Sequence, residues 1–152
     1  MPVNQAYQGR EYPPTPAYEV SREKIREFAE AVGALAGGPS PYTDTATARA
    51  LGHADVVAPP TFAVIIAQRA EQQLVADPGA AIDFSRVVHA EERFTAHRPI
   101  VAGDRLVTVL HVDAITERAG LSMVTTRCEI ADESGTPVAT VRSTLAVRGE
   151  GA

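Results

Sequence analysis

Apolar residues in the first half of the chain recur at helical spacing in two stretches. In residues 21–33, Ile25, Phe28, Ala29 and Val32 fall on one face, which predicts an amphipathic helix. Ser21 comes directly before this pattern and is the expected N-cap, and the helix should end near Gly33. A shorter helix is expected over residues 45–51, with Asp44 or Thr45 as its cap.

The second stretch, residues 62–75, differs because its first turns are apolar almost all round. Polar residues enter this stretch only from Gln68 onward. A helix that is apolar on all sides is usually buried, so we expect a central helix whose first half is covered by the rest of the chain. Pro59 and Pro60 break any regular element before it, and Thr61 is the predicted N-cap.

The pattern changes to alternation in the second half of the chain, which indicates strands. The predicted strands cover residues 86–98, 105–117, 121–131 and 136–147, with a short strand at 17–20. At about 3.3 Å per residue, strands of this length outspan a small globule and must curl around something. The central helix is the only candidate, so the predicted fold is α+β: a long antiparallel sheet wrapped around one helix, the hot-dog fold.

The length of 152 residues indicates one domain. We expect a proline-bearing N-terminal arm over residues 1–16, a single domain over 17–148 and a tail over 149–152. The net charge of −5 and the lack of a basic run argue against a nucleic-acid or anionic-membrane partner. No apolar run approaches the ~20 residues of a membrane span, and the N-terminus is polar, so the expected location is the cytoplasm.

Few residues have the spacing of a metal or cofactor site. His89, His97 and His111 are spread over predicted strands without metal-ligand spacing. Gly37-Gly38 lacks the lysine of a phosphate loop. The single cysteine, Cys128, lies in an alternating strand pattern and is expected to be a small buried hydrophobe. The sequence therefore predicts no metal and no cofactor.

Several stretches, taken in order, resemble the MaoC-like dehydratase family, specifically the fatty-acid-synthase-type dehydratase N-terminal domain. They are residues 21–33, Tyr42-Thr43-Asp44, Leu51-Gly52-His53-Ala54-Asp55, Ala58-Pro59-Pro60-Thr61-Phe62 and the turn at residues 97–104. The resemblance covers about residues 15–148. It implies the hot-dog fold and an acyl thioester substrate carried on coenzyme A or on an acyl carrier protein (ACP).

The chain departs from this family at the catalytic motif, which runs Gly-Asp-x-Asn-Pro-x-His. Gly33 matches the motif glycine, but Ala34 stands where the aspartate belongs and Tyr42 where the histidine belongs. Alanine cannot move a proton, and a tyrosine hydroxyl with an ordinary pKa of about 10 is a poor base at neutral pH. At this length the chain also resembles the non-catalytic subunit of the actinobacterial 3-hydroxyacyl-ACP dehydratase.

That resemblance implies a subunit that shapes the acyl channel of a (3R)-hydroxyacyl thioester dehydratase while a homologous partner supplies Asp and His. Tyr42, Pro60, Thr61 and Phe62 are then the expected substrate-binding residues, with the backbone N–H groups of Thr61 and Phe62 directed at the thioester oxygen.

Two alternatives stay open at this point. The chain could be a stand-alone hot-dog hydratase or thioesterase that uses displaced groups, for which Asp44, His53 and Asp55 are the candidates. It could also be a homodimer that binds acyl thioesters without chemistry. Exposed sheet edges invite pairing, so a dimer is expected, either with itself or with a homologous subunit.

Overall fold

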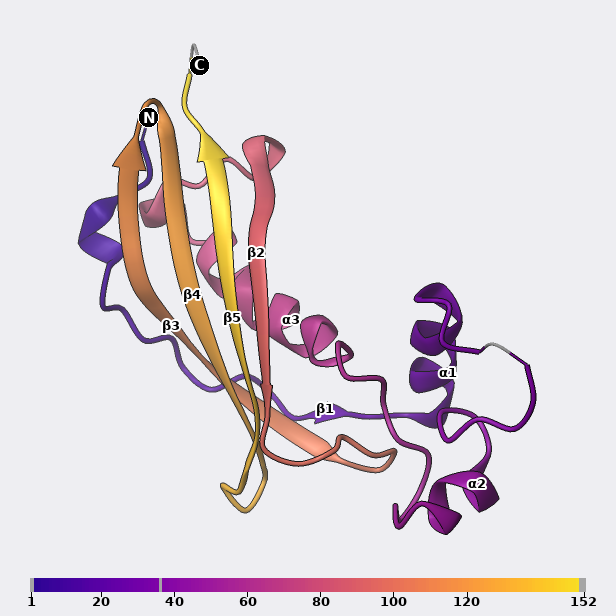
Figure 1. Cartoon of the computed structure of the whole chain (residues 1–152). Helices are drawn as coiled ribbons and strands as arrows, with labels where there is room; N and C mark the ends of the chain where they lie inside the picture. The colour runs from indigo at the N-terminus through magenta and orange to yellow at the C-terminus, as the bar shows by residue number, and fades with distance from the viewer. Residues whose placement is uncertain (1, 36, 151–152) are drawn as a thin grey trace.

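Five antiparallel strands form one curved sheet, and the longest helix lies against one of its faces (Figure 1). The computed structural model describes residues 2–35 and 37–150. Its strands are β1 (Tyr18–Glu19), β2 (Val87–Ala96), β3 (Arg105–Arg118), β4 (Leu121–Asp132) and β5 (Pro137–Arg148), in the order β1-β3-β4-β5-β2. Its helices are α1 (Arg22–Ala31), α2 (Thr45–Ala50) and α3 (Ala63–Val75), with 3-10 turns η1 (Gln5–Tyr7), η2 (Pro78–Ala80) and η3 (Phe84–Arg86).

The core lies between α3 and one face of the sheet. On β3, Leu106 and Leu110 are buried, and Val124 and Cys128 are buried beside them on β4. Leu74 of α3 belongs to the same core cluster. The four long strands begin and end within two residues of their predicted bounds, so the predicted hot-dog fold is confirmed.

The N-cap predicted for α1 is confirmed, and of the two candidates for α2 the cap is Asp44. Ser21 Oγ accepts a hydrogen bond from Lys24 N at 3.1 Å, and Asp44 Oδ2 accepts one from Thr47 N at 2.9 Å. Each side chain satisfies a backbone N–H that the first turn of its helix leaves without a partner.

The predicted N-cap of the central helix is wrong. α3 begins at Ala63, its N-cap is Phe62, and no side chain caps it. A backbone turn replaces the side-chain cap, since Phe62 N donates to Pro59 O at 2.9 Å and Val64 N donates to Thr61 O at 3.1 Å. Thr61 therefore contributes its carbonyl and leaves its side chain exposed.

The N-terminal arm lies along the outer edge of β3 (Figure 1). Gly9 N donates to Val112 O at 2.8 Å, and Tyr12 N donates to Leu110 O at 2.9 Å. The arm thus continues the edge cover that β1 begins. At the other edge of the sheet, β2 pairs with β5 alone among the described strands.

Asp77, just after α3, anchors this arm to the body. Its carboxylate accepts hydrogen bonds from Tyr7 Oη at 2.9 Å, Tyr12 Oη at 3.0 Å and Arg10 Nη1 at 3.0 Å. The guanidinium of Arg10 also stacks over the Tyr7 ring at 3.8 Å. The sequence left open whether the arm docks, and these contacts show that it does.

At the C-terminal end, Gly149 N donates to Gly120 O at 2.8 Å, so the chain stays attached to the β3–β4 turn just past β5. The last part of the expected tail, residues 151–152, lies outside the described residues. Across the described residues, no helix is both long and apolar enough to cross a membrane.

Candidate functional site

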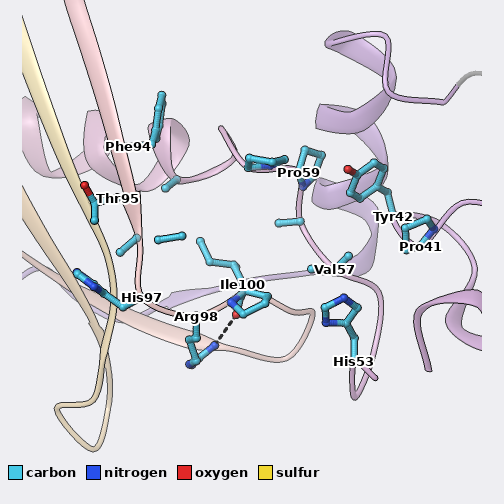
Figure 2. Close-up of a pocket in the computed structure, with 16 residues that line it drawn as sticks. Pro41, Tyr42, His53, Val57, Pro59, Phe94, Thr95, His97, Arg98 and Ile100 are labelled. Atoms are coloured by element: carbon cyan, nitrogen blue, oxygen red, sulfur yellow. Dashed lines mark hydrogen bonds between the residues drawn. The ribbon is translucent and has the colours of Figure 1, made fainter. Parts of the chain in front are cut away.

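A pocket of about 560 Å³ lies at the N-terminal end of α3 (Figure 2). Four parts of the chain form it: the loops that precede α3, the first residue of α3, the end of β2 with the turn that follows, and the start of β5. Its lining residues are Pro41, Tyr42, His53, Val57, Ala58, Pro59, Pro60, Ala63, Phe94, Thr95, Ala96, His97, Arg98, Pro99, Ile100 and Ala139. Most of these side chains are apolar.

Backbone hydrogen bonds hold the loop before α3 against the turn after β2. Ala58 N donates to Ile100 O at 2.8 Å, and Ala102 N donates to Val56 O at 3.0 Å. Val57 forms a bridge with Val101 between these two bonds. The two walls of the pocket are therefore fixed to each other although about forty residues separate them in sequence.

Arg98 and Asp104 brace the turn from inside. Arg98 donates from Nη1 to Asp104 Oδ2 at 2.8 Å and from Nη2 to Asp104 Oδ1 at 3.0 Å. Asp104 Oδ2 also accepts from Val101 N at 2.9 Å, and Arg98 Nη1 donates to Pro99 O at 2.9 Å. The hydrogen bond to Asp104 is the largest of the effects that raise the pKa of Arg98.

Tyr42 lines the pocket and also packs against the core cluster. Figure 2 shows it between Pro41 and Pro59. Ala34, the other position of the motif, follows α1, where its N–H donates to Ala29 O at 2.8 Å. Ala34 does not line the pocket.

The three acid–base candidates of the stand-alone alternative differ in their contacts. Asp44 caps α2, and the hydrogen bond from the Thr47 side chain is the main cause of its lowered pKa. Asp55 accepts two hydrogen bonds from Arg22, at 3.0 and 2.8 Å, which chiefly lower its pKa. Of the three, His53 alone lines the pocket.

The substrate-binding residues that were expected at the start of α3 differ in their position relative to the pocket. Pro60 lines the pocket, but Thr61 and Phe62 do not. Phe62 is 0% exposed and meets the Phe28 ring edge to face, with 5.5 Å between centroids. Its N–H donates to Pro59 O at 2.9 Å, so the expected contact of this N–H with a thioester oxygen would need that bond to open.

Sequence reasoning missed the wall that the second half of the chain contributes. Phe94 and Ala96 come from β2, and Ala139 lies opposite Ala96 on β5. His97 follows β2 and lies 3.0 Å from Thr140 Oγ1 through Nε2. The signal available was the turn at residues 97–104, which the sequence singled out without assigning it to a pocket.

The described lining of the pocket lacks acidic groups, which limits the chemistry that it can perform. None of the described residues that line the pocket is an aspartate or a glutamate. Across the described residues, no group of three or more His, Cys, Asp or Glu side chains could hold a metal ion. The positive end of the α3 dipole begins at Ala63 and faces this space.

Comparison with known proteins shows which family this chain belongs to. A UPF0336 protein from Saccharopolyspora erythraea is 55% identical over 150 residues, which cover 98% of this chain and 94% of that protein. A chain of the C-terminally truncated HadBC (3R-hydroxyacyl-ACP dehydratase) complex from Mycobacterium tuberculosis superposes with a TM-score of 0.79 at 30% identity, covering 92% of this chain and 96% of that one.

A second solved structure, described as a MaoC-like dehydratase, has a TM-score of 0.84 at 32% identity and is longer, since 96% of this chain covers 43% of it. The family model for the FAS1-like dehydratase domain region matches residues 6–141. The chain therefore belongs to the FAS1-like dehydratase family, one of the MaoC-like dehydratases with a hot-dog fold.

Proposed function

We propose that this chain is the subunit of a (3R)-hydroxyacyl thioester dehydratase that shapes the acyl channel, while a homologous hot-dog partner supplies the catalytic aspartate and histidine. The substrate is an acyl chain carried as a thioester on coenzyme A or ACP. The family membership supports the reaction class, and the pocket supports the division of labour.

The observation that carries this proposal is a well-formed pocket at the start of α3 whose described wall has no carboxylate. Dehydration needs one group to take a proton from C2 and another to protonate the departing hydroxyl at C3. Ala34 can do neither, and Tyr42 occupies the position of the motif histidine. The chain keeps the binding surface and lacks the motif's acid–base pair.

The pocket suits an acyl thioester. Val57, Phe94 and Ile100 provide apolar wall for the chain, and burial of apolar surface contributes roughly 25 cal/mol per Å². The start of α3 offers a positive dipole end to the thioester oxygen.

The edges of the sheet support a partner on one side. The arm and β1 cover the edge at β3, whereas β2 offers an edge with no described strand beyond it. Phe94, Thr95 and Ala96 belong to β2 and line the pocket. A hot-dog partner that pairs with β2 would therefore border the pocket and could direct its own Asp and His toward it.

A stand-alone hydratase or thioesterase is the second candidate, because His53 and His97 both line the pocket. A histidine can act as a general base near neutral pH. In this alternative His53 replaces the missing motif histidine.

The deciding experiment follows loss of enoyl absorbance during hydration of crotonyl-CoA. The purified chain is assayed alone and with a homologue that carries an intact Gly-Asp-x-Asn-Pro-x-His motif, and the control is the same homologue with its motif Asp and His replaced. We expect no turnover by the chain alone and turnover above that of either component with the intact homologue.

Turnover by the chain alone that disappears in His53→Ala would establish the stand-alone enzyme instead. Silence in every mixture, together with binding of acyl-CoA by the chain alone, would favour a non-enzymatic acyl-thioester-binding homodimer.

A further inference from the structure

A second, smaller cavity of about 110 Å³ lies farther along the interface between α3 and β2. It is lined by Gln68, Glu71, Gln72, Val75, Phe84, His89 and Leu145. Ala63 lines the larger pocket and Glu71 the smaller one, eight residues on, which is roughly 12 Å along a helix axis. Residues four and eight apart share a helix face, so the two cavities follow one line along α3.

The inward side chains of β2 lie between the two cavities. Phe94 lies opposite Val141 and Glu92 opposite Ser143, and both of these β5 partners are buried. Glu92 and Phe94 are two residues apart on β2 and therefore share a face. A register shift between His89 and Glu91 returns His89 to that face, opposite Leu145. From the large pocket toward the small one, the order along β2 is therefore Phe94, Glu92, His89.

Glu92 and Glu71 form a polar barrier at the interface between α3 and β2. Glu71 is 4% exposed, and its Oε1 accepts from the buried Thr126 Oγ1 at 3.0 Å. Glu92 Oε1 accepts from Ser143 Oγ at 2.9 Å, while Glu92 Oε2 is buried without a hydrogen-bond partner in the described part of the chain.

Burial is the main cause that raises the pKa of Glu92, and the nearby charge of Glu71 raises it further, against the opposing effects of Ser143 and His89. An apolar chain end placed against these groups could not supply the hydrogen bond that Glu92 Oε2 lacks, and a buried carboxyl oxygen without a partner is costly.

We propose that Phe94 and the Glu71–Glu92 pair close the inner end of the pocket and restrict this subunit to short acyl chains. The proposal rests on the proposed function, in which the pocket receives the acyl group. Phe94 blocks the path sterically, and the carboxyl pair behind it makes the next stretch of α3 unfavourable for methylene groups. For a longer acyl group, the apolar wall of the pocket ends at Phe94.

The test compares crotonyl-CoA with hexadecenoyl-CoA in the mixture of this chain with the catalytic homologue. In the wild-type mixture, kcat/KM for crotonyl-CoA should exceed kcat/KM for hexadecenoyl-CoA by about tenfold or more, since each methylene that a pocket cannot accommodate costs about that factor. The double variant Phe94→Ala/Glu92→Ala joins the two cavities and should reduce the preference by about tenfold.

Arg93→Ala is the matched control, because Arg93 lies between the two substituted residues and faces outward, where it pairs with Glu91 at 2.8 Å. It should keep the wild-type preference. Circular dichroism verifies folding, and Phe94→Ala alone decides the question if the double variant does not fold.

The length limit is overturned if the wild-type mixture uses both substrates equally, or if the folded double variant keeps the wild-type preference. In either case, activity of the mixture leaves the proposed function standing. If no mixture is active, the proposed function fails. Calorimetric titration of the chain alone with butyryl-CoA and palmitoyl-CoA then decides: tighter binding of butyryl-CoA supports the length limit, and tighter or equal binding of palmitoyl-CoA, or binding of neither, overturns it.

Discussion

Replacing Asp104 with alanine should destabilise the protein far more than an ordinary surface ion pair would suggest. Asp104 accepts two hydrogen bonds from Arg98 and one from Val101 N, at 2.8, 3.0 and 2.9 Å. The Asp104 side chain is 14% exposed and that of Arg98 is 31% exposed. The substitution leaves a half-buried guanidinium and one backbone N–H without this acceptor.

A hydrogen bond to a charged group contributes about 1.5–3 kcal/mol. The three bonds share one carboxylate, Arg98 keeps Pro99 O as an acceptor, and solvent screens part of the charge. We therefore expect a total loss of about 2–4 kcal/mol rather than the sum of three full contributions. In a chain of this size that corresponds to a fall in Tm of roughly 5–15 °C.

The matched control is Glu133→Ala. Glu133 also pairs with an arginine, Arg105 Nε at 2.6 Å, but the two side chains are 56% and 51% exposed. Exposed pairs contribute about 0–1 kcal/mol, so this variant should unfold close to the wild type. Urea unfolding followed by circular dichroism measures both, and equal losses in the two variants would refute the reasoning from burial.

Three further predictions follow from the same contacts. A hydrogen bond from Tyr7 is the largest cause that lowers the pKa of Asp77. Because the folded pKa is lowered, this stabilisation is present above the unfolded pKa of about 4 and is lost as pH falls through the folded pKa. Below about pH 4 the Tm should therefore fall less steeply with pH in Asp77→Asn than in the wild type, and identical acid profiles would contradict this. Phe62→Ala should cost about 3–5 kcal/mol in urea unfolding because the ring is fully buried. Thr61→Ala should change stability by less than about 0.5 kcal/mol, and a loss of about 1–2 kcal/mol in this variant would mean that Thr61 has a capping role after all. Burial raises the pKa of Cys128, so iodoacetamide should label it only after unfolding, and rapid labelling of the native protein, read by mass spectrometry, would contradict its placement.

The sequence by itself determined the elements of this fold. Strand alternation and helical spacing depend on residues two to four positions apart, so they can be read without the tertiary structure. The caps Ser21 and Asp44 were predictable for the same reason, because each bonds a backbone N–H three residues later. Thr61 shows the limit of this local reasoning, since a turn closed by the Pro59 carbonyl replaced the side-chain cap.

The sequence alone also shows that the chain contains no Gly-Asp-x-Asn-Pro-x-His motif. That Ala34 and Tyr42 stand at its Asp and His positions is what the family resemblance implies, and it stays a prediction. Sequence placed Tyr42 and His53 near an expected cleft, and the pocket contains both. It grouped Asp44 and Asp55 with them, although Thr47 and Arg22 hold these two carboxylates.

Only the tertiary structure decided which residues form the pocket. Phe94, Ile100 and Ala139 line one pocket with Tyr42 because the sheet curls around α3 and because Ala58 N bonds to Ile100 O across the chain. Likewise, the arm contacts Asp77 through residues some seventy positions away. Contacts of this kind depend on how the whole sheet twists and where β2 shifts register, and no pattern of neighbouring residues encodes them separately.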